Sequence, residues 1–173
     1  QAEGQLRLYV LMLARLGRVQ EAVDEGLQYF DKPSKFLALA RVLREREEPE
    51  KALRVAERGL TAEGHKGELA AWLCDLADGM GKMECALEAA MVAFHEMPSM
   101  AAYQRVQELA GGRWSDLRED LLAHLRQVSG YSYSEAQVDV FLHEGLLDDA
   151  IAAVEKSAGY DLLERVMDAV VEH

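Results

Sequence analysis

The sequence predicts an all-α fold, a right-handed superhelix of about five antiparallel helical hairpins. A short phrase recurs along the 173 residues at intervals of 30, 34, 31 and 33. Its last residues are Ala22, Ala52, Ala86, Leu117 and Ala150. Such a period, carried by helix-forming residues, is typical of stacked helical hairpins, none of which can bury its apolar face alone. The composition agrees, because 50% of the residues are hydrophobic but only 7% are aromatic, which favours helix over strand.

The first three hairpins follow from apolar residues three and four positions apart. They turn at Gly17, Glu47–Glu48 and Gly79–Gly81. We expect the core faces of their first helices to be Leu6, Tyr9, Val10 and Leu13, then Phe36, Leu39, Ala40 and Leu43, then Leu69, Trp72, Leu73, Leu76 and Ala77. The second helices are expected to contribute Ala22, Gly26 and Tyr29, then Ala52, Ala56 and Gly59, then Ala86, Ala90 and Ala93. Small residues at these positions let paired helices approach to about 8–10 Å.

The remaining hairpins are less regular. Gly111–Gly112 turns the fourth, and residues 129–133 read as a loop that leads to Ser134, a suitable N-cap for the fifth. The fifth turns at Gly145, and residues 161–171 begin an incomplete sixth unit. That last helix should expose Leu162, Leu163, Val166 and Val170. We expect residues 1–173 to form one helical-repeat domain, a fragment of a longer protein.

The spacing of Gly17 to Ala22, Glu47 to Ala52, Gly81 to Ala86 and Gly145 to Ala150 resembles that of the tetratricopeptide repeat. The chain departs from that pattern because only Phe36 supplies the large aromatic residue expected early in the first helix. The resemblance implies a non-enzymatic scaffold for a protein or peptide partner.

A narrower resemblance rests on residues 102–114, 144–151 and 160–166, which look like the helical region of bacterial SWIM zinc-finger proteins. The Cys-x-Cys and Cys-x-His pairs of that finger are absent here. The resemblance implies that any zinc site lies outside these residues. An alternative function follows, in which this helical domain helps a zinc-finger protein dock on nucleic acid through the basic stretch Arg41–Arg58.

Catalytic, cofactor-binding and metal-binding residues are not predicted. The five histidines are scattered and lack the i, i+4 pairing of a helical metal site. Cys74 and Cys85 have no basic neighbour in sequence that would activate a thiol, and two cysteines make no disulfide framework, which favours a reducing compartment. The pairs Asp75/Asp78 and Asp148/Asp149 have no nucleophile or base beside them.

Net charge and hydropathy limit the classes of partner that this chain is expected to bind. The net charge is −12, made of +1 over residues 1–60 and −13 over residues 61–173. Phosphate backbones repel an acidic chain, so we expect no direct nucleic-acid binding by this segment. No apolar run approaches the ~18 residues that a membrane span requires, so we expect no membrane partner and a cytoplasmic location.

One set of charges is a candidate partner-binding site. First helices line the concave face of a hairpin superhelix, and five residues there are expected to contact a partner: Arg7, Arg41, Arg44, Asp75 and Asp78, with Arg15 beside them. This face would be basic in the first two hairpins and acidic in the third. Such a surface suits an extended peptide or a helix whose charges are complementary in the same order. Lys51, Arg54 and Arg58 lie on the following helix and should project to the opposite side.

Overall fold

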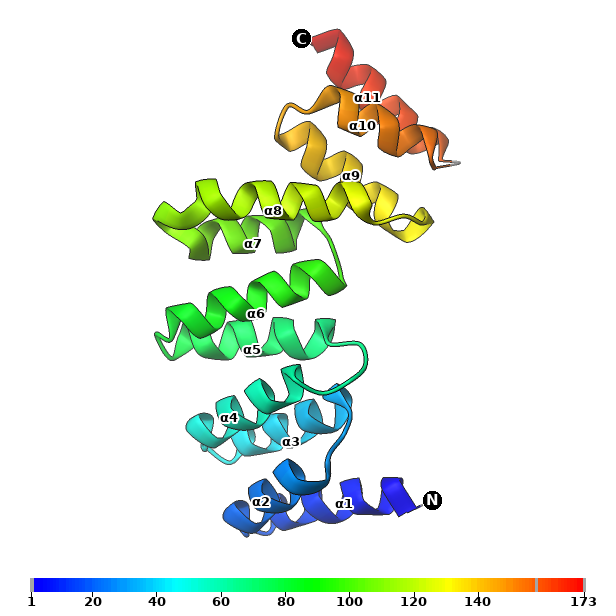
Figure 1. Cartoon of the computed structure of the whole chain (residues 1–173). Coiled ribbons are helices and arrows are strands. Elements are labelled where there is room, and N and C mark those ends of the chain that lie inside the picture. The colour runs from blue at the N-terminus through cyan, green and yellow to red at the C-terminus, as the bar shows by residue number, and fades with distance from the viewer. Residues whose placement is uncertain (1, 158, 173) are drawn as a thin grey trace. The chain divides into compact units, whose positions relative to one another are not determined.

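The computed structural model describes residues 2–157 and 159–172, and the described residues are helical with short turns and no strand. The chain forms two compact units, residues 1–96 and 97–173. The first unit contains α1 (Ala2–Arg15), α2 (Val19–Tyr29), α3 (Pro33–Glu45), α4 (Pro49–Leu60), α5 (Gly67–Gly79) and α6 (Met83–Glu96) (Figure 1). The second contains α7 (Met100–Ala110), a 3₁₀ turn η1 (Gly111–Arg113), α8 (Trp114–Gln127), α9 (Tyr131–His143), α10 (Leu147–Glu155) and α11 (Tyr160–Glu172).

Each hairpin turns through one residue in the left-handed region of the backbone. The φ angles are 84° at Gly17, 72° at Gly81, 51° at Gly111 and 71° at Gly145. The second hairpin has Glu47 at the equivalent place, with a φ of 60°. In four of the five hairpins the next residue donates its amide five positions back, as Arg18 does to the carbonyl of Leu13 at 3.0 Å. This pattern is the Schellman motif, which satisfies carbonyls at a helix end and reverses the chain. The predicted turn positions are confirmed.

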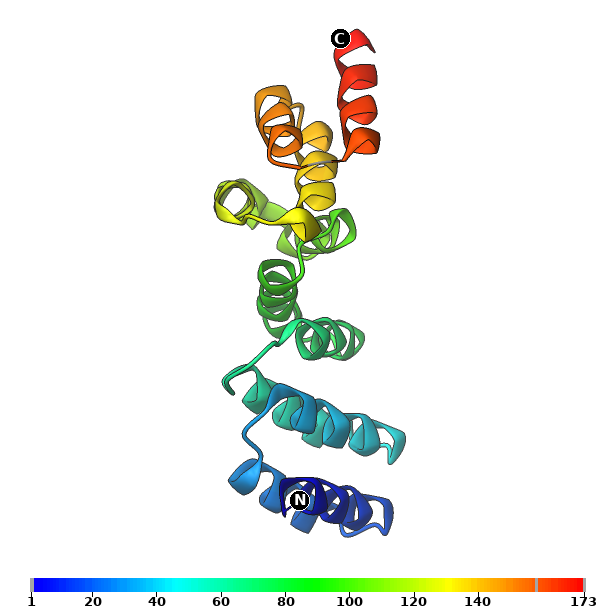
Figure 2. The ribbon, with the colours of Figure 1, turned by 90° about the vertical axis from the view of Figure 1, so that its right-hand side faces the viewer.

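The paired helices of the first unit lie side by side (Figure 2) and meet through small residues. Ala22, Ala52 and Ala86 are fully buried. A β-carbon on Gly26 would come 2.5 Å from Leu39 Cδ2. On Gly59 it would come 2.6 Å from Leu69 Cδ2 and 2.7 Å from Phe36 Cβ. Thus α2 reaches α3, and α4 reaches both its own partner α3 and the following α5.

The second unit has hairpins of α7 with α8 and of α9 with α10, and α11 contacts both α9 and α10. Its core contains Tyr103, Val106, Leu121, Leu122, Leu125, Val138, Phe141 and Ala150. Gln137 is buried on α9 and donates to the carbonyls of Leu125 at 2.6 Å and Val128 at 3.0 Å. It therefore satisfies two carbonyls at the end of α8 that have no partner within that helix.

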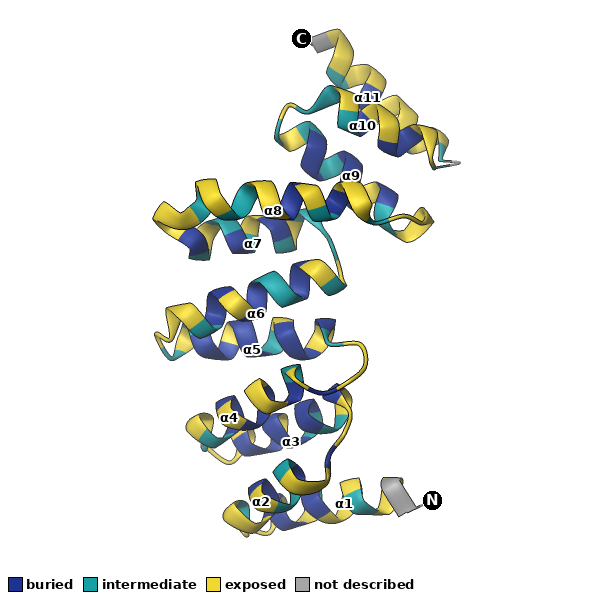
Figure 3. Ribbon diagram, viewed as in Figure 1, coloured by how far each residue is buried: buried dark blue, intermediate teal, exposed yellow. Residues whose placement is uncertain are grey.

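Each helix is buried along one side and exposed along the other (Figure 3). Four details of the sequence prediction are wrong. Tyr9 and Tyr29 are half exposed, and Phe30 enters the core beside Tyr29 instead. Helix α9 begins at Tyr131 after Gly130, so Ser134 is a buried helical residue rather than an N-cap. Val166 is buried because α11 packs on α9 and α10, whereas Leu163 and Val170 are exposed as expected.

Candidate partner-binding surface

Residues of different hairpins can be matched by counting back from the left-handed residue of each turn. At one matched position in the first helices, the charge alternates from hairpin to hairpin. Six residues before the turn stand Arg41, Asp75, Arg105 and Asp139, with Leu11 at this place in the first hairpin. Arg44 and Asp78 are likewise equivalent, three residues before their turns. The predicted switch from basic to acidic is therefore a change at two matched positions between the second and third hairpins.

The structure brings the predicted site residues of the first unit onto one layer of helices. Helix α1 contacts α3, and α3 contacts α5. Arg7, Arg41, Arg44 and Asp75 are exposed, and Asp78 is half-buried. Arg7 is one turn before Leu11 on α1, so it does not share the matched position of Arg41. The position of a bound partner on this layer stays a prediction.

Arg41 already has an intramolecular partner that the sequence prediction missed. Its guanidinium donates to Glu68 Oε1 at 2.8 Å, which links α3 to α5. The side chains are 50% and 70% exposed. Exposed ion pairs contribute only about 0–1 kcal/mol, so a carboxylate from outside can replace Glu68 at small cost. No local signal could have shown this pair, because Arg41 and Glu68 are 27 residues apart in sequence.

A depression of about 330 Å³ adjoins this ion pair. It lies where α3 and α5 begin, and Glu68 itself forms part of its wall. The apolar part of the lining is Pro33, Leu37 and Leu69. The surface thus combines a cation with a shallow apolar recess.

The second unit makes the equivalent bridge with the charges exchanged. Asp139 on α9 accepts from Arg165 on α11 at 2.9 Å, and Glu135 pairs with the same arginine at 3.4 Å. Asp139 and Arg41 occupy the same position relative to their turns. An ion pair between successive first helices therefore recurs in the two units.

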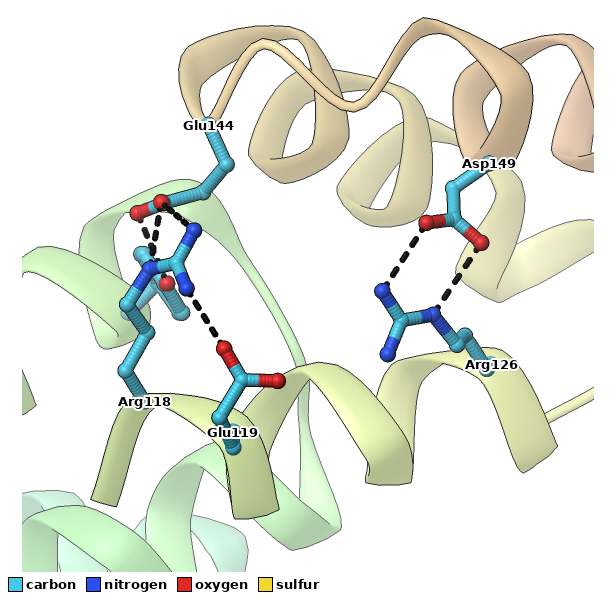
Figure 4. Close-up of polar contacts among 6 residues, drawn as sticks. Arg118, Glu119, Arg126, Glu144 and Asp149 are labelled. Carbon is cyan, nitrogen blue, oxygen red and sulfur yellow. Dashed lines mark hydrogen bonds and ion pairs between the residues drawn. The ribbon is translucent and has the colours of Figure 1, made fainter. Parts of the chain in front are cut away.

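A largely enclosed polar cluster lies in the second unit (Figure 4). Glu144 accepts from the Tyr103 hydroxyl at 2.8 Å and from Arg118 at 2.6 Å. Burial alone would raise the pKa of Glu144, but the hydrogen bonds from Arg118 and Tyr103 outweigh it and lower the pKa below 4.5. Burial and the Glu144 carboxylate raise the pKa of Tyr103.

A second contact in the same figure has a related role. Arg126 on α8 donates to both carboxylate oxygens of Asp149 on α10, at 3.0 and 2.9 Å (Figure 4). Such a bidentate pair adds geometric specificity. Glu144, before the α9–α10 turn residue, is joined to α7 and α8, and Asp149, after that turn, is joined to α8. Asp149 lies in the first turn of α10, and its partner Arg126 lies 23 positions earlier in the sequence. These contacts position helices, and we assign them no binding role.

Two features are absent from the described residues, 2–157 and 159–172. No group of three or more His, Cys, Asp or Glu side chains is arranged to hold a metal ion. Within the same ranges, every helix is too short or too polar to cross a bilayer.

The fold and its surface define an all-α protein built from antiparallel helical hairpins. Comparison with solved structures finds a Podosopora anserina putative kinesin light chain with nearly identical TPR-like repeats. It is 16% identical over 97% of this chain and 94% of that chain, with a TM-score of 0.39. No protein-family model matches the chain, and no curated protein matches it either.

Proposed function

We propose that this chain is a non-enzymatic scaffold that binds a protein segment along α1, α3 and α5. The observation that carries the proposal is the matched pair Arg41 and Arg44 on α3, one helical turn apart and both exposed. The bound segment presents acidic residues to these arginines and an apolar side chain to the depression beside Glu68. Arg7 and Arg15 extend the basic end, and Asp75 and Asp78 favour a basic residue further along the segment.

Glu68 supplies a sharp test of this site. Peptides selected from a displayed library on the wild-type chain are measured by fluorescence anisotropy. Charge reversal at Arg41 and Arg44 should weaken the binding of an acidic peptide by about 1 kcal/mol per residue. This loss of binding free energy should shrink as the salt concentration rises. Glu68→Gln should strengthen the binding of the same peptide, because it removes the carboxylate that competes for Arg41.

The matched control is charge reversal at Arg54 and Arg58 on α4. It changes the net charge equally but acts on the following helix. Arg58 lies 5.9 Å from the centre of the Phe36 ring, so Arg54→Glu alone is included to separate binding from stability. Equal losses from both helices, or no loss from Arg41 and Arg44, would exclude this surface.

Docking on nucleic acid through residues 41–58, within a SWIM zinc-finger protein, is the second candidate. A local excess of arginine favours it, since this stretch contains Arg41, Arg44, Arg46, Lys51, Arg54 and Arg58. Arg41 and Lys51 are already paired with Glu68 and Glu48, and the chain carries a net charge of −12, which supports the protein partner instead. Salt-dependent binding of the chain to duplex or single-stranded nucleic acid would reverse this choice.

A further inference from the structure

Helix α1 exposes a row of large apolar side chains. Leu8 and Met12 on α1 and Leu16 directly after the helix follow one another at intervals of four, and they are 57%, 59% and 71% exposed. Tyr9 lies beside them and is 49% exposed. Monomeric proteins seldom expose such a contiguous stripe. A partner that covers it would remove this apolar surface from water.

In the other hairpins, the equivalent face of the first helix is buried. Tyr9 is eight residues before its turn, and its equivalents Leu39, Leu73 and Gln137 are at most 5% exposed. The equivalents of Met12 are Val42, Leu76 and Val140, again at most 5% exposed. Gly26 of α2 lies directly against Leu39, so the preceding hairpin covers this face on α3. The exposed side of α1 thus continues an interface that is already established between successive hairpins.

Helix α11 exposes a second apolar row. Leu163, Met167 and Val170 occur at intervals of four and three, and they are 43%, 58% and 47% exposed. Val171 extends the row. The two helices have nearly equal lengths, 14 residues in α1 and 13 in α11, so their rows can match along about 20 Å.

The charges beside the two rows are opposite. Arg7 and Arg15 flank the row on α1, and residues 4–18 contain no acidic residue. Glu164 and Asp168 lie along one side of the row on α11 and are exposed. The basic residue of α11, Arg165, is paired with Asp139 and Glu135. Pairing α1 with a second α1, or α11 with a second α11, would oppose like charges, whereas α1 against α11 opposes unlike charges.

We propose that a second copy of this chain is the occupant, with α1 of one molecule docked on α11 of the next. The contact is heterologous, so each added molecule leaves one free α1 face and one free α11 face. Self-association therefore increases with concentration rather than ending at a symmetric dimer.

Sedimentation velocity on the 173-residue chain tests this proposal over a range of about 5 to 500 μM. The average mass should rise with concentration. Reversal of the basic flank by Arg7→Glu with Arg15→Glu, or of the acidic flank by Glu164→Lys with Asp168→Lys, should each weaken association about tenfold or more. An equimolar mixture of the two variants should restore association, because the reversed flanks are complementary. Circular dichroism confirms that each variant is folded.

The control is Arg41→Glu with Arg44→Glu, which changes net charge as much as the α1 variant but lies on α3. It should leave association unchanged. Because Arg7 and Arg15 also belong to the proposed peptide site, the Glu164→Lys with Asp168→Lys variant on α11, which changes no residue of that site, separates the two proposals. Any of three results would overturn the proposal: a wild-type chain that stays monomeric throughout, association that survives both reversals, or a mixture that fails to restore it.

Discussion

The hydroxyl of Tyr103 donates to the carboxylate of Glu144 at 2.8 Å, and Arg118 donates to the other oxygen of that carboxylate at 2.6 Å. Tyr103 belongs to α7, Arg118 to α8, and Glu144 directly follows α9. The Glu144 side chain is only 12% exposed. One carboxylate thus connects three helices of the second unit, and its loss should be felt in the stability of that unit.

Glu144→Gln should destabilise the chain by about 1–3 kcal/mol at neutral pH, because the charged acceptor of two hydrogen bonds is lost. The folded pKa of Glu144 lies below 4.5, so its contribution is fully present above that pH and is lost as the pH falls through the folded value. Urea unfolding at a series of pH values from 7 downward measures this, and the difference in stability between the variant and the wild type should shrink as the pH falls. A constant difference between them would contradict the assignment.

Glu47→Gly should stabilise the second hairpin by about 0.5–1 kcal/mol. Glu47 holds a φ of 60°, which glycine adopts without the steric cost that a side chain incurs. Thermal unfolding of the variant measures the gain. Gly17→Ala, the reverse change at the equivalent turn, should destabilise by a similar amount, and a loss of stability in Glu47→Gly would show that its side chain has a compensating role.

Gly59→Ala should destabilise by about 1–3 kcal/mol, because the added carbon would come 2.7 Å from the Phe36 β-carbon, which the backbone holds. Gly26→Ala should cost less. Its nearest atom is the movable tip of Leu39, and alanine is favoured over glycine in a helix by about 1 kcal/mol. Chemical denaturation of both variants gives the comparison, and the opposite ranking would disprove the close approach at Gly59.

Ala52→Leu should overpack the contact between α3 and α4 and destabilise by about 1–3 kcal/mol. Ala52 is fully buried, whereas Ala71 on α5 is exposed. Ala71→Leu therefore serves as the control and should change the melting temperature little. If both leucines are tolerated equally well, α3 and α4 do not meet at Ala52.

Cys85 should react slowly with alkylating reagents at pH 8. Burial is the main cause that raises its pKa to about 12, and Glu57, which accepts from the thiol at 3.3 Å, raises it further. Glu57→Gln removes the negative charge and should increase the alkylation rate of Cys85 in the folded chain. Mass spectrometry of timed reactions measures the rate, and an unchanged rate would mean that Glu57 has no influence on the thiolate.

The sequence by itself determined the helical hairpins, their turns and their closest contacts. Gly17, Gly81 and Gly145 mark the turns because a left-handed backbone is a local requirement that glycine meets most easily. Ala52 and Gly59 mark the close approach because helical periodicity places them on one face. These features depend on neighbours within a few residues, and they recur with the repeat.

Only the tertiary structure decided how the charged residues pair and which apolar residues stay exposed. Glu68 reaches Arg41 across 27 positions, and Glu144 reaches Tyr103 across 41. Tyr9 and Met12 have the spacing of core residues, yet they are exposed because no described helix packs on that side of α1. Burial and ion pairing depend on which surfaces meet when hairpins stack, and a local pattern along the chain does not contain that information.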